Sequence, residues 1–214
     1  MKRALAENRW LYDNYLTNEL REFIRLSIIE IDKSNDHYSL DFYWEGDKLI
    51  GGIGGYCMPK NPIQNPFKSG IKRSIYRHLQ YAASEIEMRD VRYGARYVIQ
   101  FAGMHLEAVV RYFLATNQLF GKIRQSNSTL GKAFNHLKSK GLIGKEQIEP
   151  FQRFIKLFNK AKHEINMDDE RERLFSFIDA LVLYYVARML GLNLLNKMDS
   201  DELNSSYEIT VEMH

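Results

Sequence analysis

Residues 151–165 read FQRFIKLFNKAKHEI, and this stretch decides how the second half of the chain folds. Plotted on a helix at about 100° per residue, its apolar side chains occupy a single arc. That arc contains Phe151, Phe154, Ile155, Phe158, Ala161 and Ile165. The far side holds Gln152, Lys156, Asn159 and His163, stacked at spacings of four, three and four. The stretch therefore predicts an amphipathic helix that buries one face and presents these four residues as a polar ridge.

Helical periodicity extends in both directions from this stretch, from Ser69 almost without interruption to Leu195. The predicted helices cover about 8–31, 70–90, 92–119, 130–140, 146–165 and 168–190. Ser126 to Thr129 supplies N-cap residues, and Lys140-Gly141 is a stop signal. Acidic residues 168–170 suit the N-terminus of the last helix, with Gly191 past its end. The sequence thus predicts a mainly α fold.

The first 67 residues have a different pattern. Residues 38–44 alternate as in a half-buried strand, and Glu45-Gly46-Asp47 separates them from a second short strand at 48–50. We therefore expect an N-terminal helix and a small hairpin. Residues 51–67 are rich in glycine and proline, but their spacing matches no phosphate-binding loop, so they form an irregular connection. The expected organisation is an appendage over 1–67, a helical bundle over 68–195 and a polar tail over 196–214, in which 207–211 is either an edge strand or frayed.

The composition favours a soluble globular protein over a membrane, exported or disulfide-rich one. The 214 residues are 45% hydrophobic and 27% charged, which is typical of a soluble globular domain. The N-terminus becomes polar before a signal-type apolar stretch forms, and no membrane span is expected. The single Cys57 excludes an internal disulfide and leaves no zinc-binding spacing. We expect a cytoplasmic protein with no metal and no cofactor.

Charge is segregated along the chain. Residues 111–163 carry 11 basic and 2 acidic side chains, whereas residues 164–214 carry 4 basic and 11 acidic ones. Such asymmetry is consistent with a face that binds a polyanion such as nucleic acid. It is equally consistent with two segments that neutralise one another in the fold. The sequence leaves both interpretations open.

Four segments together resemble a known family over about residues 92–195. They are Leu106–Leu114, Leu130–Lys138, Phe158–His163 and Asp179–Leu190. In this order they resemble the HEPN superfamily, small helical domains found in prokaryotic toxins, abortive-infection proteins and RNA-processing factors. The resemblance implies an up-and-down bundle of four to five helices that usually pairs two chains or two domains, and hence a homodimer.

The signature of active members of this family is an arginine, a polar residue that is often asparagine, three further residues and a histidine. Asn159 and His163 match the last two elements, but Phe158 occupies the arginine position. The family implies metal-independent RNA cleavage, with His163 as general acid or base and Asn159 orienting the imidazole or the phosphate. Lys156, Lys160 and Lys162 are the candidate RNA-binding cations. A lysine is a poorer phosphate ligand than the missing arginine because it lacks the planar fork.

Three hypotheses follow. The first is a metal-independent ribonuclease of toxin or phage-defence type, with His163 and Asn159 in a dimeric site and a cognate antitoxin or other protein as partner. The second is a catalytically inactive module that binds RNA or docks a protein, which the phenylalanine at position 158 favours. The third is a helical partner subunit without nucleic-acid contact, in which the ridge is an ordinary solvated helix face. The other histidines, including His105 and His136, are expected to be structural or incidental.

Overall fold

The computed structural model describes residues 6–33, 45–46, 48–50, 71–87, 91–119, 129–167 and 173–198. Within these ranges the chain is a mainly α bundle of seven helices, and no strand occurs in them. The helices are α1 (Ala6–Asn14), α2 (Asn18–Lys33), α4 (Ile71–Glu87), α5 (Val91–Thr116), α6 (Leu130–Ser139), α7 (Lys145–His163) and α8 (Phe177–Leu195). The predicted fold class is confirmed.

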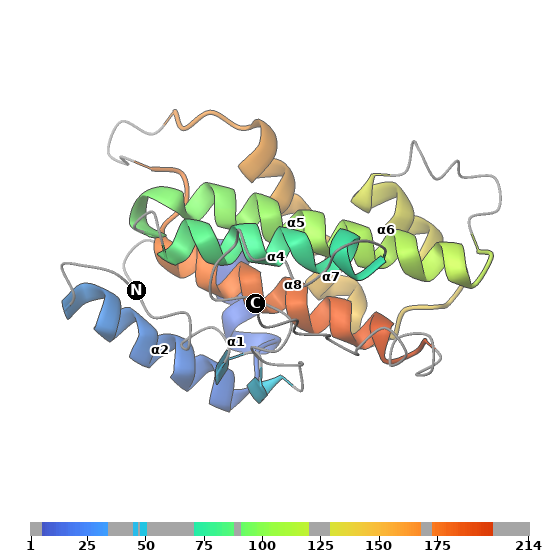
Figure 1. Ribbon diagram of the computed structural model, residues 1–214, viewed down its shortest axis with the longest axis horizontal. Coiled ribbons are helices and arrows are strands. Elements are labelled where there is room, and N and C mark those ends of the chain that lie inside the picture. Colours follow the sequence, from blue (N-terminus) through green and yellow to red (C-terminus); the bar gives the residue numbers. More distant parts are fainter. Residues whose placement is uncertain are drawn as a thin grey trace, which may run out of the picture.

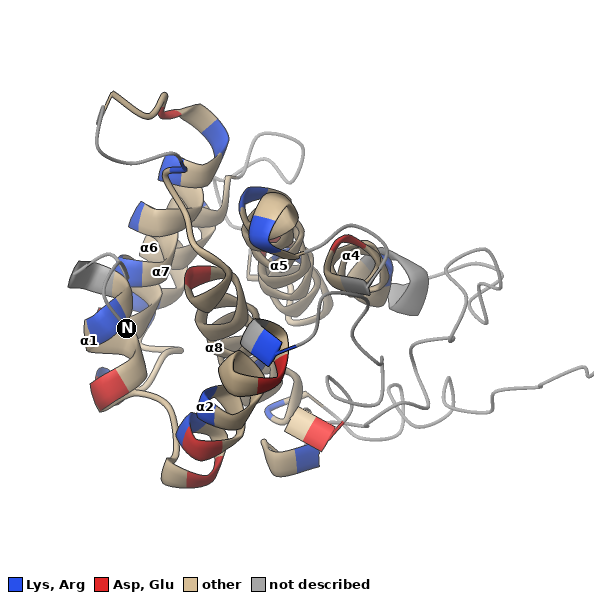
Figure 2. Cartoon of the chain, turned by 90° about the vertical axis from the view of Figure 1, so that its left-hand side faces the viewer, with Lys and Arg blue, Asp and Glu red and all other residues tan. Residues whose placement is uncertain are grey.

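Helix α8 lies at the centre of the bundle. It contacts α1, α2, α5 and α7, and the end-on view shows these helices around it (Figure 2). Helix α5 packs between α8 and α4 along most of its length, with α1 and α2 on the far side of α8 (Figure 1). A helix that is apolar on all sides belongs inside a bundle. Accordingly, α8 is long and apolar enough to cross a membrane, yet 83% of its apolar window is buried within this fold.

The borders of the short helix α6 were predicted correctly. The Thr129 side chain accepts a hydrogen bond from the Lys132 backbone amide and caps the N-terminus. At the other end Gly141 has a φ of +65°, a left-handed conformation that glycine adopts without a steric penalty. Helix α6 therefore ends where the Lys140-Gly141 signal indicated.

The single helix predicted over residues 8–31 is wrong, because the chain forms two helices there. Helix α1 ends at Asn14 and α2 begins at Asn18. Between them, the Thr17 hydroxyl accepts a hydrogen bond from the Leu20 amide. A threonine that binds the backbone amide three residues on favours a helix start. This local capping interrupts an apolar pattern that looks continuous in sequence.

The predicted start of the last helix is also wrong. Helix α8 begins at Phe177 rather than near 168, and Gly191 lies inside it rather than beyond its end. Ser176 and Asp179 form a reciprocal capping box, in which each side chain accepts a hydrogen bond from the other residue's backbone amide. The Asp179 carboxylate is buried and also accepts from the Asn8 side chain at 2.7 Å. The capping box and the hydrogen bond to Asn8 therefore fix the start of α8 at Phe177, and not the acidic residues 168–170 on which the prediction was based.

The hairpin predicted after the first helix is wrong where the structure describes it. Lys48 and Leu49 are helical, and Ile50 lies in a turn rather than in a strand. The first predicted strand, the glycine- and proline-rich connection and the edge strand in the tail fall outside the described residues. The hydrophobic core itself runs across the expected boundary at residues 67 and 68, since Leu11, Leu20 and Ile24 share one buried cluster with α5, α7 and α8.

Candidate functional site

The inner face of α7 fixes the orientation of the helix. Phe151, Phe154, Phe158 and Ala161 are buried as predicted. Ile165 was predicted to join them but is 78% exposed, because α7 ends at His163 and the chain is extended at the next residue. The predicted buried face of α7 is therefore found only up to His163, where the helix ends.

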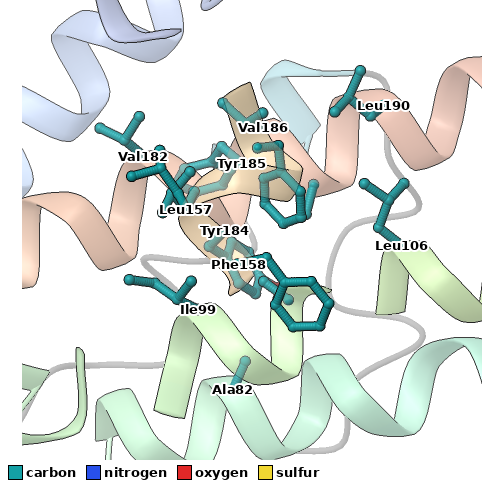
Figure 3. Close-up of a cluster of buried hydrophobic side chains, with 14 of the residues drawn as sticks. Ala82, Ile99, Leu106, Leu157, Phe158, Val182, Tyr184, Tyr185, Val186 and Leu190 are labelled. Carbon is teal, nitrogen blue, oxygen red and sulfur yellow. The ribbon is translucent and has the colours of Figure 1, made fainter. Parts of the chain in front are cut away.

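Phe158 lies in the hydrophobic core of the bundle. Its side chain is 1% exposed and lies among residues of α5 and α8, including Ile99 and Tyr184 (Figure 3). Helix α5 approaches closely at Gly103, where an added Cβ would overlap the Phe158 ring. The position at which the family signature has an arginine is therefore a packed apolar site.

The four ridge residues Gln152, Lys156, Asn159 and His163 are all exposed. They lie on the outside of α7, on the side turned away from Ala161 and the core. Asn159 and His163 make no hydrogen bond or ion pair within the part of the chain that the structure describes. Hence no group in the described residues orients the His163 imidazole, and both side chains face outward toward any ligand.

The three candidate lysines sit around the ridge in different surroundings. The Lys162 ammonium lies over the Phe158 ring, 4.1 Å from its centroid, so this cation is next to the position that lacks the arginine. The half-buried Lys160 forms an ion pair with the exposed Glu164 at 3.5 Å. Lys156 is exposed on the ridge itself. Lysine and arginine positions recur along α6 and α7 on one side of the bundle (Figure 2).

Arg153 does not supply the missing guanidinium. It forms an ion pair with Glu149 at 2.7 Å, and its guanidinium stacks over the Trp10 ring of α1 at 4.3 Å from the centroid. Ion pairing and stacking hold it nearly three turns before His163 along the helix. It fastens α1 to α7 instead.

A second arginine does reach the end of α7, and the sequence analysis missed it. Arg96 of α5 donates from Nε to the carbonyl oxygen of Ala161 at 2.5 Å, and Gln100 donates to the same oxygen at 2.6 Å. A cation at a helix C-terminus is favoured because the last carbonyls lack intrahelical donors. Ala161 faces α5, whereas His163 faces outward, so Arg96 lies on the opposite side of α7 from the ridge. No local sequence signal reveals a contact between residues 65 positions apart.

The bundle also contains a buried pair of basic residues, His105 of α5 and Arg188 of α8. The Ile75 carbonyl can only accept, so the His105 Nδ1 donates to it at 2.8 Å. The Nε2 then accepts from the Arg188 guanidinium at 3.2 Å. Burial, reinforced by the charge of Arg188, holds the pKa of His105 well below its ordinary value of 6.5. His105 is therefore a neutral structural residue, whereas the role of Arg188 was not predicted.

The described residues contain no group of three or more histidine, cysteine, aspartate or glutamate side chains that would hold a metal ion. Comparison with known proteins adds no relative: the chain matches no protein-family model, no curated protein and no solved structure. The geometry of α7 and its surroundings is accordingly the basis for any functional proposal.

Proposed function

We propose that this protein is a HEPN-like RNA-binding bundle that contacts the RNA backbone with the outer face of α7. The observation that carries the proposal is the division of α7 into a buried face and an exposed polar ridge flanked by lysines. Phosphates are bound by lysine side chains and by neutral donors such as asparagine, which position the strand without reading its sequence. Asn159, His163 and the three lysines form such a surface.

Burial of Phe158 favours binding over cleavage as the basic activity. Developing negative charge on a phosphorane needs a fixed cation, and the buried ring occupies the place where the family signature puts one. Lys162 is the nearest replacement, but its ammonium already lies over that ring. The amide groups of Gln152 and Asn159 and the lysine ammonium groups suit contact with phosphates better than stabilisation of a transition state.

The test of binding uses a labelled single-stranded RNA and fluorescence anisotropy. Lys156→Gln and Lys162→Gln are each expected to weaken binding several-fold, while the exposed Lys132→Gln on α6 serves as a control with the same loss of charge. Equal affinity for all three variants and the unmodified protein would overturn the proposal. Circular dichroism of each variant establishes that the bundle is intact.

Cleavage is the second candidate, and one observation favours it. Asn159 and His163 are exposed one turn apart with no partner in the described residues, which leaves the imidazole available to a ligand or to a second copy of the chain. Two ridges facing across a twofold axis would bring two imidazoles and several lysines into one groove. Such a homodimer would form the ribonuclease, of toxin or phage-defence type, that the family resemblance implies.

Incubation with RNA in EDTA separates the two candidates. Cleavage predicts products with 2′,3′-cyclic phosphate ends that disappear in His163→Ala, while Asn135→Ala on α6 is a control for loss of an exposed amide. Binding alone predicts intact RNA whose affinity survives His163→Ala with at most a small change. Intact RNA with the unmodified protein at a concentration where it is dimeric by sedimentation would exclude the nuclease.

A further inference from the structure

A second feature of the molecule, distinct from the ridge, is a pocket of about 300 Å³ beside the N-terminal half of α5. Tyr93, Arg96 and Tyr97 of α5 form one wall, and Asn166 and Arg173 from the segment between α7 and α8 form another. None of the described residues that line it is acidic. Its volume is at the lower end of small-ligand sites, which suits a group no larger than a single nucleotide.

Both arginines are anchored by their backbone contacts. Arg96 donates its Nε to the Ala161 carbonyl, and its two terminal nitrogens make no hydrogen bond or ion pair within the described ranges. Arg173 donates from Nη1 to the Arg92 carbonyl at 2.9 Å. A guanidinium that is already held in place loses less conformational entropy when it binds an anion. The pocket thus offers preorganised donors for a phosphate.

The tyrosines supply flat surfaces next to these cations. Tyr93 is 67% exposed and Tyr97 49% exposed, and they stand one turn apart on α5. The Arg173 guanidinium covers one face of Tyr93 at 3.9 Å from the ring centroid. Exposed aromatic rings interleaved with arginines are the combination by which proteins stack bases and hold the adjacent phosphates of single-stranded RNA.

We infer that this pocket binds one nucleotide of an RNA strand, with its phosphate on Arg96 and Arg173 and its base stacked on Tyr97. The inference rests on the proposed RNA binding and gives it a second contact point. Asn166 follows His163 by three residues, so the Cα atoms of the ridge end and of the pocket wall are at most about 11 Å apart. Single-stranded RNA of the length that one small domain covers spans both sites.

The pocket is tested separately from the ridge by titrating the full chain with three small probes: uridine 5′-monophosphate, uridine and inorganic phosphate. Saturation-transfer NMR reports contact between each probe and the protein. The nucleotide is expected to bind more tightly than either fragment. Arg96→Ala should weaken nucleotide binding about tenfold or more, as expected for loss of a hydrogen bond to a charged group. Arg25→Ala, which removes an exposed arginine from α2, should leave nucleotide binding unchanged.

Because Arg96 also contacts α7, Arg96→Ala could weaken nucleotide binding by disturbing the fold. Two further variants distinguish this effect from loss of a direct contact with the nucleotide. Tyr97→Leu removes a half-exposed ring without touching the contact to α7, and it should weaken the nucleotide but not inorganic phosphate. Arg96→Lys retains the charge and should restore part of the affinity. If inorganic phosphate binds as tightly as the nucleotide, or Tyr97→Leu has no effect, base stacking is excluded and the inference is overturned.

Photocrosslinking separates failure of the pocket from failure of RNA binding. An RNA containing 4-thiouridine is expected to crosslink to the peptide that carries Tyr93 and Tyr97. Crosslinks confined to α7 would overturn the pocket and leave the proposed function standing. Nucleotide binding that depends on Arg96, together with no binding of any longer RNA, would retain the pocket as a nucleotide site and overturn the proposed function.

Discussion

Phe158 is the residue on which the choice between binding and cleavage depends. Truncating a fully buried phenylalanine leaves a cavity, so Phe158→Ala is expected to lower the free energy of unfolding by about 3–5 kcal/mol. Phe158→Arg, which restores the family signature, should also destabilise the fold because it places a charge between α5 and α8. Urea denaturation measures both changes, with the exposed Gln152→Ala as a control expected to lie within about 0.5 kcal/mol of the unmodified protein.

Gly103 tests the same packing from the α5 side. A methyl group at this position would overlap the Phe158 ring, so Gly103→Ala should cost about 1–3 kcal/mol. The half-buried Gly131, whose added Cβ would meet its nearest neighbour at an ordinary 3.8 Å, is a matched control in helix α6. If Phe158→Arg were instead stable and gained RNA cleavage, the side chain at position 158 would not be buried as described.

His105 makes the stability of the protein depend on pH. Its pKa is lowered in the folded state, so between that pKa and 6.5 the unfolded chain binds more protons than the folded one. The stability that depends on a neutral His105 is therefore fully present above about pH 6.5. As the pH is lowered from there, the free energy of unfolding decreases by up to about 1.4 kcal/mol per pH unit. Burial also lowers the pKa of His78, which adds a smaller contribution of the same sign.

Urea titrations from about pH 7.5 to about pH 5 measure this slope. His105→Gln should reduce this slope, because it removes the buried imidazole. A constant free energy of unfolding over this range would show that His105 is not buried beside Arg188.

Among the elements, α8 depends most on a contact outside its own sequence. Its capping box is tied to α1 through Asn8, so Asp179→Ala removes both the cap and the buried hydrogen-bond partner of Asn8. We expect Asp179→Ala to cost more than the roughly 1 kcal/mol of an ordinary N-cap, and Ser176→Ala to cost about that amount.

Thermal unfolding followed by circular dichroism measures these effects. The exposed Ser139→Ala, which removes a side-chain hydrogen bond at the end of α6, is the control and should change stability little. If Asp179→Ala and Ser176→Ala lower the stability equally, the hydrogen bond between Asn8 and Asp179 does not stabilise the fold.

The elements also show where sequence reasoning succeeds. The two faces of α7 were predicted because the helical period depends only on residues within the helix, and the Thr129 cap and Gly141 stop of α6 are equally local. The start of α8 was not predicted, because this helix is apolar on nearly all sides and has no period to mark it. Contacts between distant segments, such as Arg96 with Ala161 and His105 with Arg188, leave no pattern in the sequence.

At the scale of the whole molecule, α8 is enclosed by its neighbours and α7 lies at the surface with its ridge outward. The mainly α class follows from the sequence pattern, whereas the arrangement around α8 depends on packing. The HEPN resemblance, the homodimer, the cytoplasmic location and an antitoxin or other protein partner stay predictions. The outward ridge and the arginine pocket make RNA the ligand to test first.

The salt dependence of RNA affinity tests the central claim most directly. Each lysine that contacts a phosphate of single-stranded RNA contributes about 0.7 to the slope of log affinity against log salt concentration. The variant with Gln at positions 156, 160 and 162 is therefore expected to lose up to about 2 from that slope. The matched variant with Gln at exposed positions 132, 138 and 140 of α6 and its C-cap has the same net charge and should keep the slope of the unmodified protein. Equal slopes for the two variants, or no salt-dependent binding at all, would contradict an RNA-binding face on α7.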